Sequence, residues 1–291
     1  MTENEFLLAD RITKIKSINE QYDLEHNAYI SFSGGKDSTV LSHLIDEALP
    51  GNHIPRVFIN TGIEYKMLVA FVERERDWRV QIINPSKNIR QILEQYGYPF
   101  KSKEHSLYVS VYQNSGVTKT VSRYLNRPDK RFSCPEKFVY QFTDNFKIKV
   151  SNKCCYKLKK DVVAKWSKDN LRPITITGMR ANEGGTRGMI KGCAIFSGNS
   201  LKKFHPLLPV EDSFIEWYIQ ERNIKLCELY FAPYNFKRTG CKGCPYSLDL
   251  QNQLYIMACY LPEERKQCEL IWGKIYEEYR RIGYRLDNTL F

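Results

Sequence analysis

The segment Ser33-Gly34-Gly35-Lys36-Asp37-Ser38 combines residue types that suit a phosphate chain. Two adjacent glycines let the backbone turn tightly and approach a ligand with no Cβ in the way. The first N–H groups of a following helix would then form an anion site. Lys36 would add a cation, and Asp37 would cap the helix or orient a metal-bound phosphate. The alternative is a glycine turn that merely joins a strand to a helix.

A second loop, from Gly178 to Arg187, supplies two guanidinium groups. Arg180 and Arg187 suit a clamp for phosphate or sulfate, because a guanidinium meets an oxyanion with two parallel hydrogen bonds. The alternative is a pair of surface arginines on a loop. The candidate catalytic residues are Lys36, Asp37, Arg180 and Arg187.

The nine cysteines include two pairs, Cys154-Cys155 and Cys241-x-x-Cys244, with 85 residues between them. A Cys-x-x-Cys loop lets two thiolates converge on one centre. Adjacent cysteines chelate a single zinc ion poorly and fit better on two irons of a cluster. An iron–sulfur cluster, structural zinc and uncoordinated or redox thiols all remain open. We expect four others to be buried small hydrophobes: Cys193, Cys227, Cys259 and Cys268. Cys134 is either structural, a ligand or a sulfur carrier.

The elements that must position these residues alternate between strands and helices. Helices are expected near residues 4–24, 36–49, 64–78 and 87–96, and strands at 28–32, 56–60, 80–83 and 174–178. This order predicts an α/β fold with a parallel sheet flanked by helices on both faces. Ligands in such sheets bind at the carboxyl ends of the strands, where the loops 33–38, 60–64 and 178–187 fall.

From about residue 200 the pattern changes to a helical, cysteine-containing C-terminal subregion. Asp212 is a candidate cap for one helix, and further helices are expected near 248–259 and 262–281. We therefore expect two parts, a nucleotide-binding domain over 1–200 and a subregion over 201–291. His105 and His205 are candidate acid–base residues, but a lone histidine is more often structural.

The loop Ser33–Ser38 resembles the PP-loop, Ser-Gly-Gly-x-Asp-Ser, of the adenine nucleotide alpha-hydrolase-like superfamily. The segment 58–65 is similar to the Asp-Thr-Gly stretch of the phosphoadenosine phosphosulfate (PAPS) reductase family, with Asn60 in place of Asp. The loop from Gly178 to Arg187 resembles that family's Gly-x-Arg-x-x-Glu-x-x-x-Arg stretch. The resemblance covers roughly residues 25–245 and implies adenine and ribose contacts at Thr61 and Gly62.

The cysteine pairs look like the ligand set of adenylyl-sulfate (APS) reductases, which implies a [4Fe–4S] cluster held by Cys154, Cys155, Cys241 and Cys244. The sequence contains no Glu-Cys-Gly-[Leu/Ile]-His segment, the stretch that carries the nucleophile of sulfonucleotide reductases, and attack on sulfate sulfur needs a thiolate. The stretches 96–105 and 238–245 look more like the DNA-phosphorothioation-type sulfurtransferase branch. There, ATP would adenylate an oxygen, pyrophosphate would leave, and sulfur would displace AMP, with Mg²⁺ offsetting the triphosphate charge.

Three functions follow from these observations. The first is ATP-dependent activation of a nucleic acid, DNA or tRNA, for sulfur insertion, with a sulfur donor protein. The second is APS or PAPS reduction to sulfite with a thioredoxin-like reductant, using Cys134, Cys259 or Cys268 as a rearranged nucleophile. The third is a non-catalytic nucleotide- or nucleic-acid-binding subunit of a larger complex. The nucleotide-binding set common to them is Ser33, Gly34, Gly35, Lys36, Asp37, Ser38, Thr61, Gly62, Gly178 and Arg180.

Composition and charge agree with a soluble nucleotide-binding protein. The chain is 42% hydrophobic and 26% charged, with a net charge of +11 from 44 basic and 33 acidic residues. This surplus favours a polyanionic partner, and much of it lies between Lys147 and Lys160, as either a nucleic-acid surface or a solvated basic face. No apolar run is long enough to span a bilayer, so the default location is cytoplasmic and no membrane partner is expected. A homo-oligomer is an open alternative to a monomer.

Overall fold

The computed structural model describes residues 2–127, 129, 133–183 and 188–287. Its contacts divide the chain into two compact units. Unit 1 is made of Met1–Asn60, Lys66–Asn84 and Val162–Thr239, and unit 2 of Thr61–Tyr65, Pro85–Asp161 and Gly240–Phe291. Each unit draws on separated stretches of chain, and neither begins or ends at residue 200. The expected domains, 1–200 and 201–291, stay a prediction.

Unit 1 is built on a six-stranded sheet in the order β3-β2-β1-β4-β6-β5. The strands are β1 (Ala28–Phe32), β2 (Arg56–Ile59), β3 (Val80–Ile83), β4 (Ile174–Ile176), β5 (Ala194–Ser197) and β6 (Ser200–Phe204). Every neighbouring pair is parallel except β5 and β6, which form an antiparallel hairpin at one edge. The strand order reverses between β1 and β4, and in such sheets the crevice at this point is the usual ligand site.

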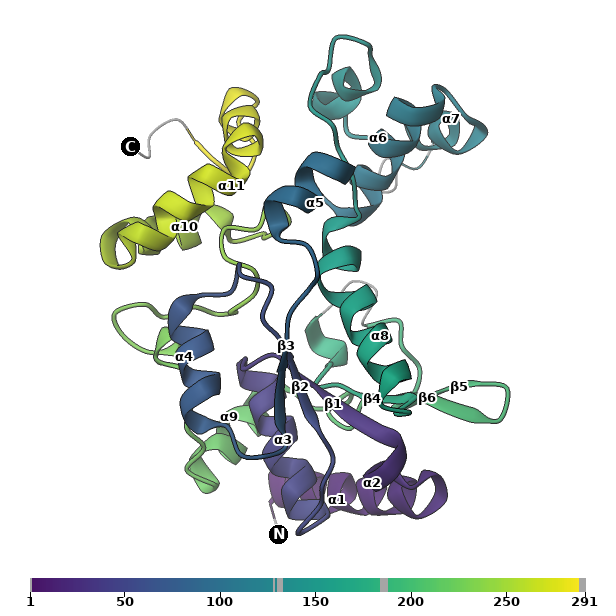
Figure 1. The fold of residues 1–291 in the computed structure, drawn as a ribbon, viewed down its shortest axis with the longest axis vertical. Helices are drawn as coiled ribbons and strands as arrows, with labels where there is room; N and C mark the ends of the chain where they lie inside the picture. Colours follow the sequence, from purple (N-terminus) through teal and green to yellow (C-terminus); the bar gives the residue numbers. More distant parts are fainter. Residues whose placement is uncertain (1, 128, 130–132, 184–187, 288–291) are drawn as a thin grey trace. The chain divides into compact units, whose positions relative to one another are not determined.

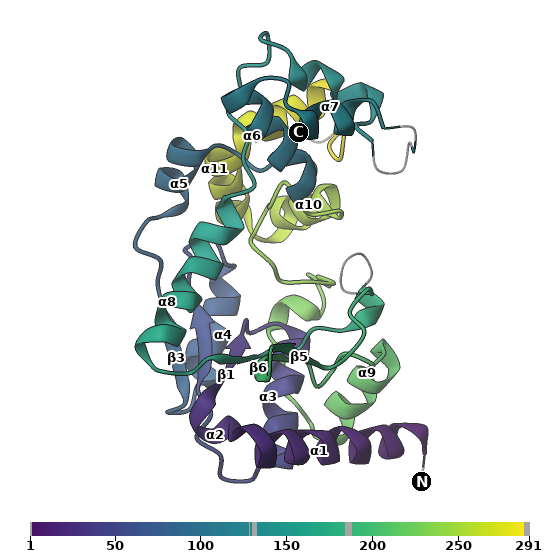
Figure 2. The ribbon, with the colours of Figure 1, turned by 90° about the vertical axis from the view of Figure 1, so that its right-hand side faces the viewer.

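Helices cover both faces of this sheet, which confirms the predicted α/β fold. The helices of unit 1 are α1 (Glu3–Tyr22), α2 (Leu24–Asn27), α3 (Lys36–Ala48), α4 (Lys66–Glu75), α8 (Asp161–Asp169) and α9 (Asp212–Glu221), with short turns η3 (Ala181–Glu183) and η4 (Glu228–Tyr230). Figure 1 shows α8 on the opposite side of the strands from α3 and α4, and Figure 2 shows α1 alongside α3. On the α8 face, Trp166 packs edge-on against Tyr29.

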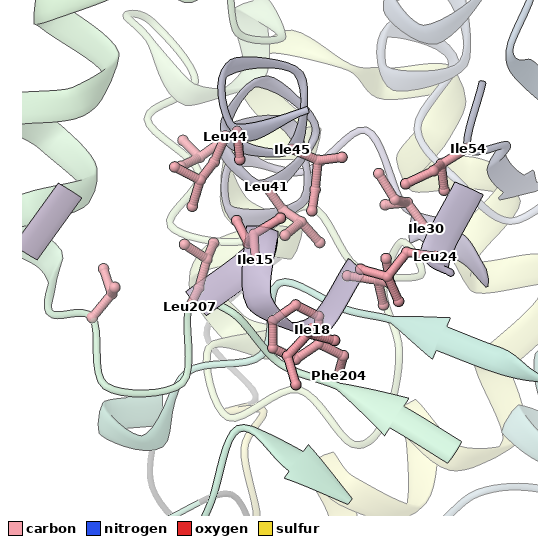
Figure 3. Close-up of a cluster of buried hydrophobic side chains, with 14 of the residues drawn as sticks. Ile15, Ile18, Leu24, Ile30, Leu41, Leu44, Ile45, Ile54, Phe204 and Leu207 are labelled. Carbon is pink, nitrogen blue, oxygen red and sulfur yellow. The ribbon is translucent and has the colours of Figure 1, made fainter. Parts of the chain in front are cut away.

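The core of unit 1 lies between the sheet and the α1, α3 and α9 layer. Apolar residues of α3 recur at helical spacing and are fully buried, as Leu41 and Leu44 are. They meet Ile15 of α1, Ile30 of β1 and Phe204 of β6 (Figure 3). This layer fixes the start of α3 at the end of β1, and so positions the loop at residues 33–35.

Asp212 was expected to cap α9, and this detail is wrong. The N-cap is Glu211, which makes no side-chain cap bond, and Asp212 is the first helical residue. Its carboxylate accepts a hydrogen bond from Arg180 instead (2.7 Å). The interaction with Arg180, 32 residues away in the sequence, replaces the local cap that an aspartate commonly forms at a helix start.

Unit 2 is largely helical. Its elements are α5 (Ile89–Tyr96), α6 (Lys103–Ser115), α7 (Lys119–Leu125), η1 (Glu136–Phe142), the π-helical turn η2 (Tyr156–Lys160), α10 (Leu250–Tyr260) and α11 (Pro262–Arg281). The adjoining helix pairs are α6 with α7 and α10 with α11. The expected helices near 248–259 and 262–281 therefore form.

The cysteines expected to be buried differ in exposure. Cys227 and Cys268 are fully buried, Cys193 is half-buried, and Cys259 is exposed near the end of α10. The expectation is wrong for Cys259, because that side of α10 faces solvent. In the described part of the chain, no helix has the length and apolar character that a membrane span needs.

His105 is a structural residue of the unit 2 core. Its side chain is completely buried, with Nδ1 3.0 Å from the Tyr124 hydroxyl and Nε2 2.7 Å from Oε1 of Gln141. The Gln141 amide donates to the Tyr140 hydroxyl, so its oxygen is directed at the ring. This network assigns the Nε2–H tautomer of a neutral imidazole. Burial lowers the pKa of His105 to about 4.

We predict that stability falls as the pH is lowered from about 6.5 to about 4. In that window the unfolded chain binds a proton at His105 that the folded chain does not, so protonation favours unfolding. The full contribution is about 3 kcal/mol. Urea unfolding followed across this pH range tests it. His105→Gln should reduce the dependence of the unfolding free energy on pH. His26→Gln, at an exposed histidine, should leave that dependence unchanged. An equal slope in all three proteins would contradict this role.

Candidate functional site

The predicted site residues fall into both units. Unit 1 holds Ser33, Gly34, Gly35, Lys36, Asp37, Ser38, Gly178 and Arg180. Unit 2 holds Thr61, Gly62, Cys154, Cys155, Cys241 and Cys244. Arg187 lies outside the described residues. The molecule therefore carries two candidate sites, a loop site in unit 1 and a thiol site in unit 2.

The loop of unit 1 joins β1 to α3 through a compact hydroxyl network. Gly34 has a left-handed backbone (φ +69°) that favours glycine. The Ser33 and Ser38 hydroxyls lie 2.9 Å apart, and that of Ser38 also donates to the Gly35 carbonyl (2.9 Å). The strand, bend and helix start that the sequence predicted are all present, and the first turn of α3 begins at Lys36.

Tyr230 is a loop-site residue that sequence reasoning missed. Its hydroxyl accepts a hydrogen bond from the Lys36 backbone N–H (3.0 Å) and lies 2.8 Å from the Thr239 hydroxyl. The Lys36 N–H is one of the donors that a helix start would offer to an anion. Tyr230 belongs to η4 and lies 194 residues after Lys36 in the sequence. No local sequence pattern predicts this contact.

Arg180 is nearly buried, with 5% of its surface exposed. Its guanidinium pairs with Asp37 on α3 (Nε to Oδ1, 3.0 Å) and with Asp212 on α9 (2.7 Å). The pKa of Asp212 is lowered, first by the hydrogen bond from Arg180 and further by the charges of Lys36 and Arg238. Three cations therefore act on this part of unit 1, as an anion site requires.

Gly178 allows the β4 loop to touch the loop site. A Cβ at this position would lie 2.7 Å from the carbonyl oxygen and 2.9 Å from the carbonyl carbon of Asp37. Real Cβ atoms essentially never come so close to backbone. Two of the loops predicted to converge, 33–38 and 178–180, are thus in direct contact within unit 1.

Thr61 belongs to a buried charged network in unit 2. Its N–H and hydroxyl both donate to the Glu64 carboxylate (2.7–2.9 Å), which pairs with Lys159 (3.2 Å). The pKa of Lys159 is raised, first by the negative charge of Cys241 and also by Glu64. Glu64 and Lys159 were not predicted as site residues, although both flank motifs that were. They connect the segment after β2 to the thiol site.

The four predicted thiols of unit 2 influence one another electrostatically. The pKa of Cys155 is lowered, chiefly by a hydrogen bond from Cys154 and also by the charges of Lys103 and Lys159. The pKa of Cys154 is raised by that bond, by burial and by the charges of Cys155, Cys241 and Cys244. Burial raises the pKa of Cys244 to about 12. The π-helical turn η2 begins directly after the pair, and such turns are frequent at functional sites.

Helix α11 holds the Cys241–Cys244 loop from one side. Trp272 Nε1 donates to the Lys242 carbonyl (3.1 Å), and the Tyr276 hydroxyl donates to the Gly243 carbonyl. The Tyr279 hydroxyl donates to the Pro245 carbonyl (3.0 Å). Three buried aromatic residues at helical spacing thus satisfy three of the four backbone carbonyls between Lys242 and Pro245. These bonds hold the loop against α11.

Four thiols are a donor set that either zinc or an iron–sulfur cluster can use. In the described part of the chain, no group of three or more His, Cys, Asp or Glu side chains is gathered as a single ion would require. A cluster instead takes its thiolates on separate irons, so its ligands lie further apart. Four thiols that lie within range of one another's charge fit that chemistry.

The basic stretch between Lys147 and Lys160 is partly engaged within unit 2. Lys149 Nζ donates to the Gln95 carbonyl (2.7 Å), Lys157 pairs with Asp161 (2.5 Å), and Lys159 pairs with Glu64. The two ion pairs neutralise part of the positive charge that the sequence places in this stretch. Its use as a nucleic-acid surface stays a prediction.

Comparison with known proteins assigns the chain to a class. Residues 27–247 match the family described as phosphoadenosine phosphosulfate reductase domain. The match spans most of the chain and includes both candidate sites, so the chain belongs to the phosphoadenosine phosphosulfate reductase family. A comparison with curated protein sequences gave no match.

Several solved structures are similar to the chain at low identity. The phosphoadenylyl-sulfate reductase of Candida auris in a phosphate complex is 14% identical, with a TM-score of 0.42 over 74% of this chain and 81% of that one. The U34-tRNA thiolase of Methanococcus maripaludis with its [4Fe-4S] cluster is 14% identical, with a TM-score of 0.40 over 96% and 80%. The FMN adenylyltransferase of Candida glabrata is 15% identical, with a TM-score of 0.45 over 79% and 62%.

We predict that Gly178→Ala disrupts the loop site. The added Cβ would push against the Asp37 backbone, so the free energy of unfolding should fall by about 1–3 kcal/mol. Urea unfolding measures this change. Gly192→Ala is the matched control, because its Cβ would lie 4.0 Å from the nearest atom. Equal behaviour of the two variants would show that the close approach does not matter.

We predict that Gly243→Ala destabilises unit 2. Gly243 has φ +60°, and a Cβ there would lie 2.7 Å from Cys268 Sγ. Strain and overlap together should lower the free energy of unfolding by about 2 kcal/mol or more. Gly240→Ala in the same loop is the control, because nothing lies within 4 Å of its Cβ. Chemical denaturation of both variants decides the matter, and an unchanged Gly243→Ala would refute the packing described for this loop.

Proposed function

We propose that the chain binds ATP at the Ser33–Ser38 loop and uses it to activate a nucleic acid for sulfur insertion. In the same proposal Cys154, Cys155, Cys241 and Cys244 hold a [4Fe–4S] cluster. The observation that carries it is the Cys241–Cys244 loop, which α11 holds in the same unit that contains Cys154 and Cys155. Membership of a family that acts on adenine nucleotides supports the nucleotide half of the proposal.

The loop site has the parts that adenylation by ATP needs. Lys36 and Arg180 would stabilise the charge that develops on the phosphates, and the first turn of α3 would donate backbone N–H groups. Asp37, whose side chain is 29% exposed, would orient Mg²⁺ on the triphosphate. An oxygen of the nucleic acid would attack the α-phosphorus of ATP, and the bond to pyrophosphate would break.

The thiol site would serve the second half of the reaction. When bound, the cluster would supply the position from which sulfur is delivered. A sulfur nucleophile from a donor protein would displace AMP from the activated acceptor, forming a carbon–sulfur or phosphorus–sulfur bond. Lys159 and Lys103 would balance the negative charge of the thiolates, as their effects on Cys155 indicate.

Reduction of APS or PAPS to sulfite fits these residues less well. A reductase needs a thiolate that can reach the sulfate sulfur. Cys134 and Cys268 are buried, and burial raises their pKa to about 11 and about 12. Cys259 is exposed on α10. The two buried cysteines are therefore poor candidates for a rearranged nucleophile, and Cys259 is the one of the three that solvent reaches.

Protein purified without oxygen tests the proposal. We expect a brown, iron-containing sample that releases pyrophosphate from ATP faster when DNA or tRNA is added. Cys154→Ser and Cys244→Ser should lose iron and visible absorption, and Lys36→Ala should slow pyrophosphate release about 10²-fold with the iron retained.

Cys259→Ser, at an exposed thiol outside both sites, is the control and should keep iron, colour and turnover. Sulfite formation from APS or PAPS with a thioredoxin would instead support reduction. An iron-free protein, or one whose pyrophosphate release ignores every nucleic acid, would contradict the proposal.

A further inference from the structure

A cluster of three cations in unit 2 surrounds two aromatic rings. Lys137 Nζ lies 4.7 Å from the Tyr284 ring centroid and 5.5 Å from that of Phe138. Lys101 Nζ lies 5.5 Å from the Phe138 centroid, and Arg285 Cζ lies 5.0 Å from the Tyr284 centroid. The two rings meet edge to face, 4.9 Å apart. The set Lys101, Lys137, Tyr284 and Arg285 is called the basic–aromatic patch below.

The patch brings three cations close to one another. In the described part of the chain, none of its three cations forms an ion pair with a carboxylate. The pKa of Lys101 is lowered, chiefly by burial, against the opposing charges of Cys134 and Glu104 and with smaller contributions from the charges of Arg285 and Lys137. Three cations gathered in this way attract an anion.

The backbone fixes this arrangement. Lys101 and Arg285 both have left-handed conformations, with φ of +57° and +60°, which are rare for residues with side chains. The Lys101 N–H donates to the Tyr279 hydroxyl (2.7 Å), and an Arg285 guanidinium nitrogen donates to the Pro245 carbonyl (2.5 Å). Such conformations persist where the surroundings hold them, and they concentrate at binding sites.

We propose that the basic–aromatic patch binds a single-stranded segment of nucleic acid. The three cations would contact successive phosphates, and a base would stack on the half-buried ring of Tyr284, whereas Phe138 is buried and serves as the floor. Cations interleaved with a partly exposed aromatic ring are the features that bind single strands with little sequence preference. This inference rests on the proposed function, because it names where unit 2 would hold the nucleic acid acceptor.

Fluorescence anisotropy of a labelled single-stranded oligonucleotide, without ATP, tests the patch. Lys137→Gln/Arg285→Gln should weaken binding about tenfold in 0.1 M salt and reduce the slope of log Kd against log salt by about two. Lys14→Gln/Lys16→Gln, on exposed positions of α1, removes the same charge elsewhere and should have little effect. Tyr284→Ala should also weaken binding about tenfold, and Tyr284→Phe should not, because it keeps the stacking ring.

Three outcomes would overturn the inference. Equal weakening by the two lysine-containing double variants would show diffuse attraction, and no weakening by either would show binding elsewhere. Displacement of the oligonucleotide by inorganic phosphate at constant ionic strength would show a site for free anions. Circular dichroism checks that each variant is folded.

The same samples separate this inference from the proposed function. If the oligonucleotide binds through the patch but never stimulates pyrophosphate release, the proposed function fails and the patch stands. If stimulated release survives unchanged in the patch variants, the patch fails and the proposed function stands.

Discussion

A buried charge must be paired, and this constraint organises both units. In unit 1, the nearly buried Arg180 lies between the carboxylates of Asp37 and Asp212. Removing one partner of such a pair typically leaves an uncompensated charge at a cost of several kcal/mol. The pair therefore fixes the β4 loop against the first turn of α3. A phosphate chain that binds at the loop would compete with Asp37 and Asp212 for the Arg180 guanidinium. Phosphate oxygens would then replace carboxylate oxygens as its partners.

Unit 2 shows the same rule and two departures from it. Lys242 is buried against Glu264, and Glu64 is buried against Lys159 and Thr61, so these charges are compensated. The thiol site departs because burial raises the pKa of both Cys241 and Cys244 and so favours their neutral forms. The basic–aromatic patch departs in the opposite sense, with three cations that form no ion pair with a carboxylate among the residues that the structure describes. Both departures are the places where we propose that a ligand of opposite charge binds.

The sequence was sufficient where local pattern and tertiary structure agree. The alternation of apolar strands and amphipathic helices predicted β1 to β4 and most of the helices of unit 1, and the double glycine located the loop between β1 and α3. The β5–β6 hairpin was missed because Lys202 and Lys203 interrupt its apolar pattern. Asp212 was misassigned as a cap because its partner, Arg180, is distant in sequence. The contact of Tyr230 with Lys36, and the bonds from α11 to the Cys241–Cys244 loop, join residues that are distant in sequence. Residue spacing does not predict such contacts.

The most direct measurement is a crystal structure of the chain with a non-hydrolysable ATP analogue. Phosphoryl oxygens within hydrogen-bonding distance of the Gly35, Lys36 and Ser38 amides, with Arg180 turned from Asp37 toward the phosphates, are the predicted result. A nucleotide bound elsewhere at saturation, with Tyr230 still on the Lys36 N–H and Arg180 still paired with both carboxylates, would contradict the account.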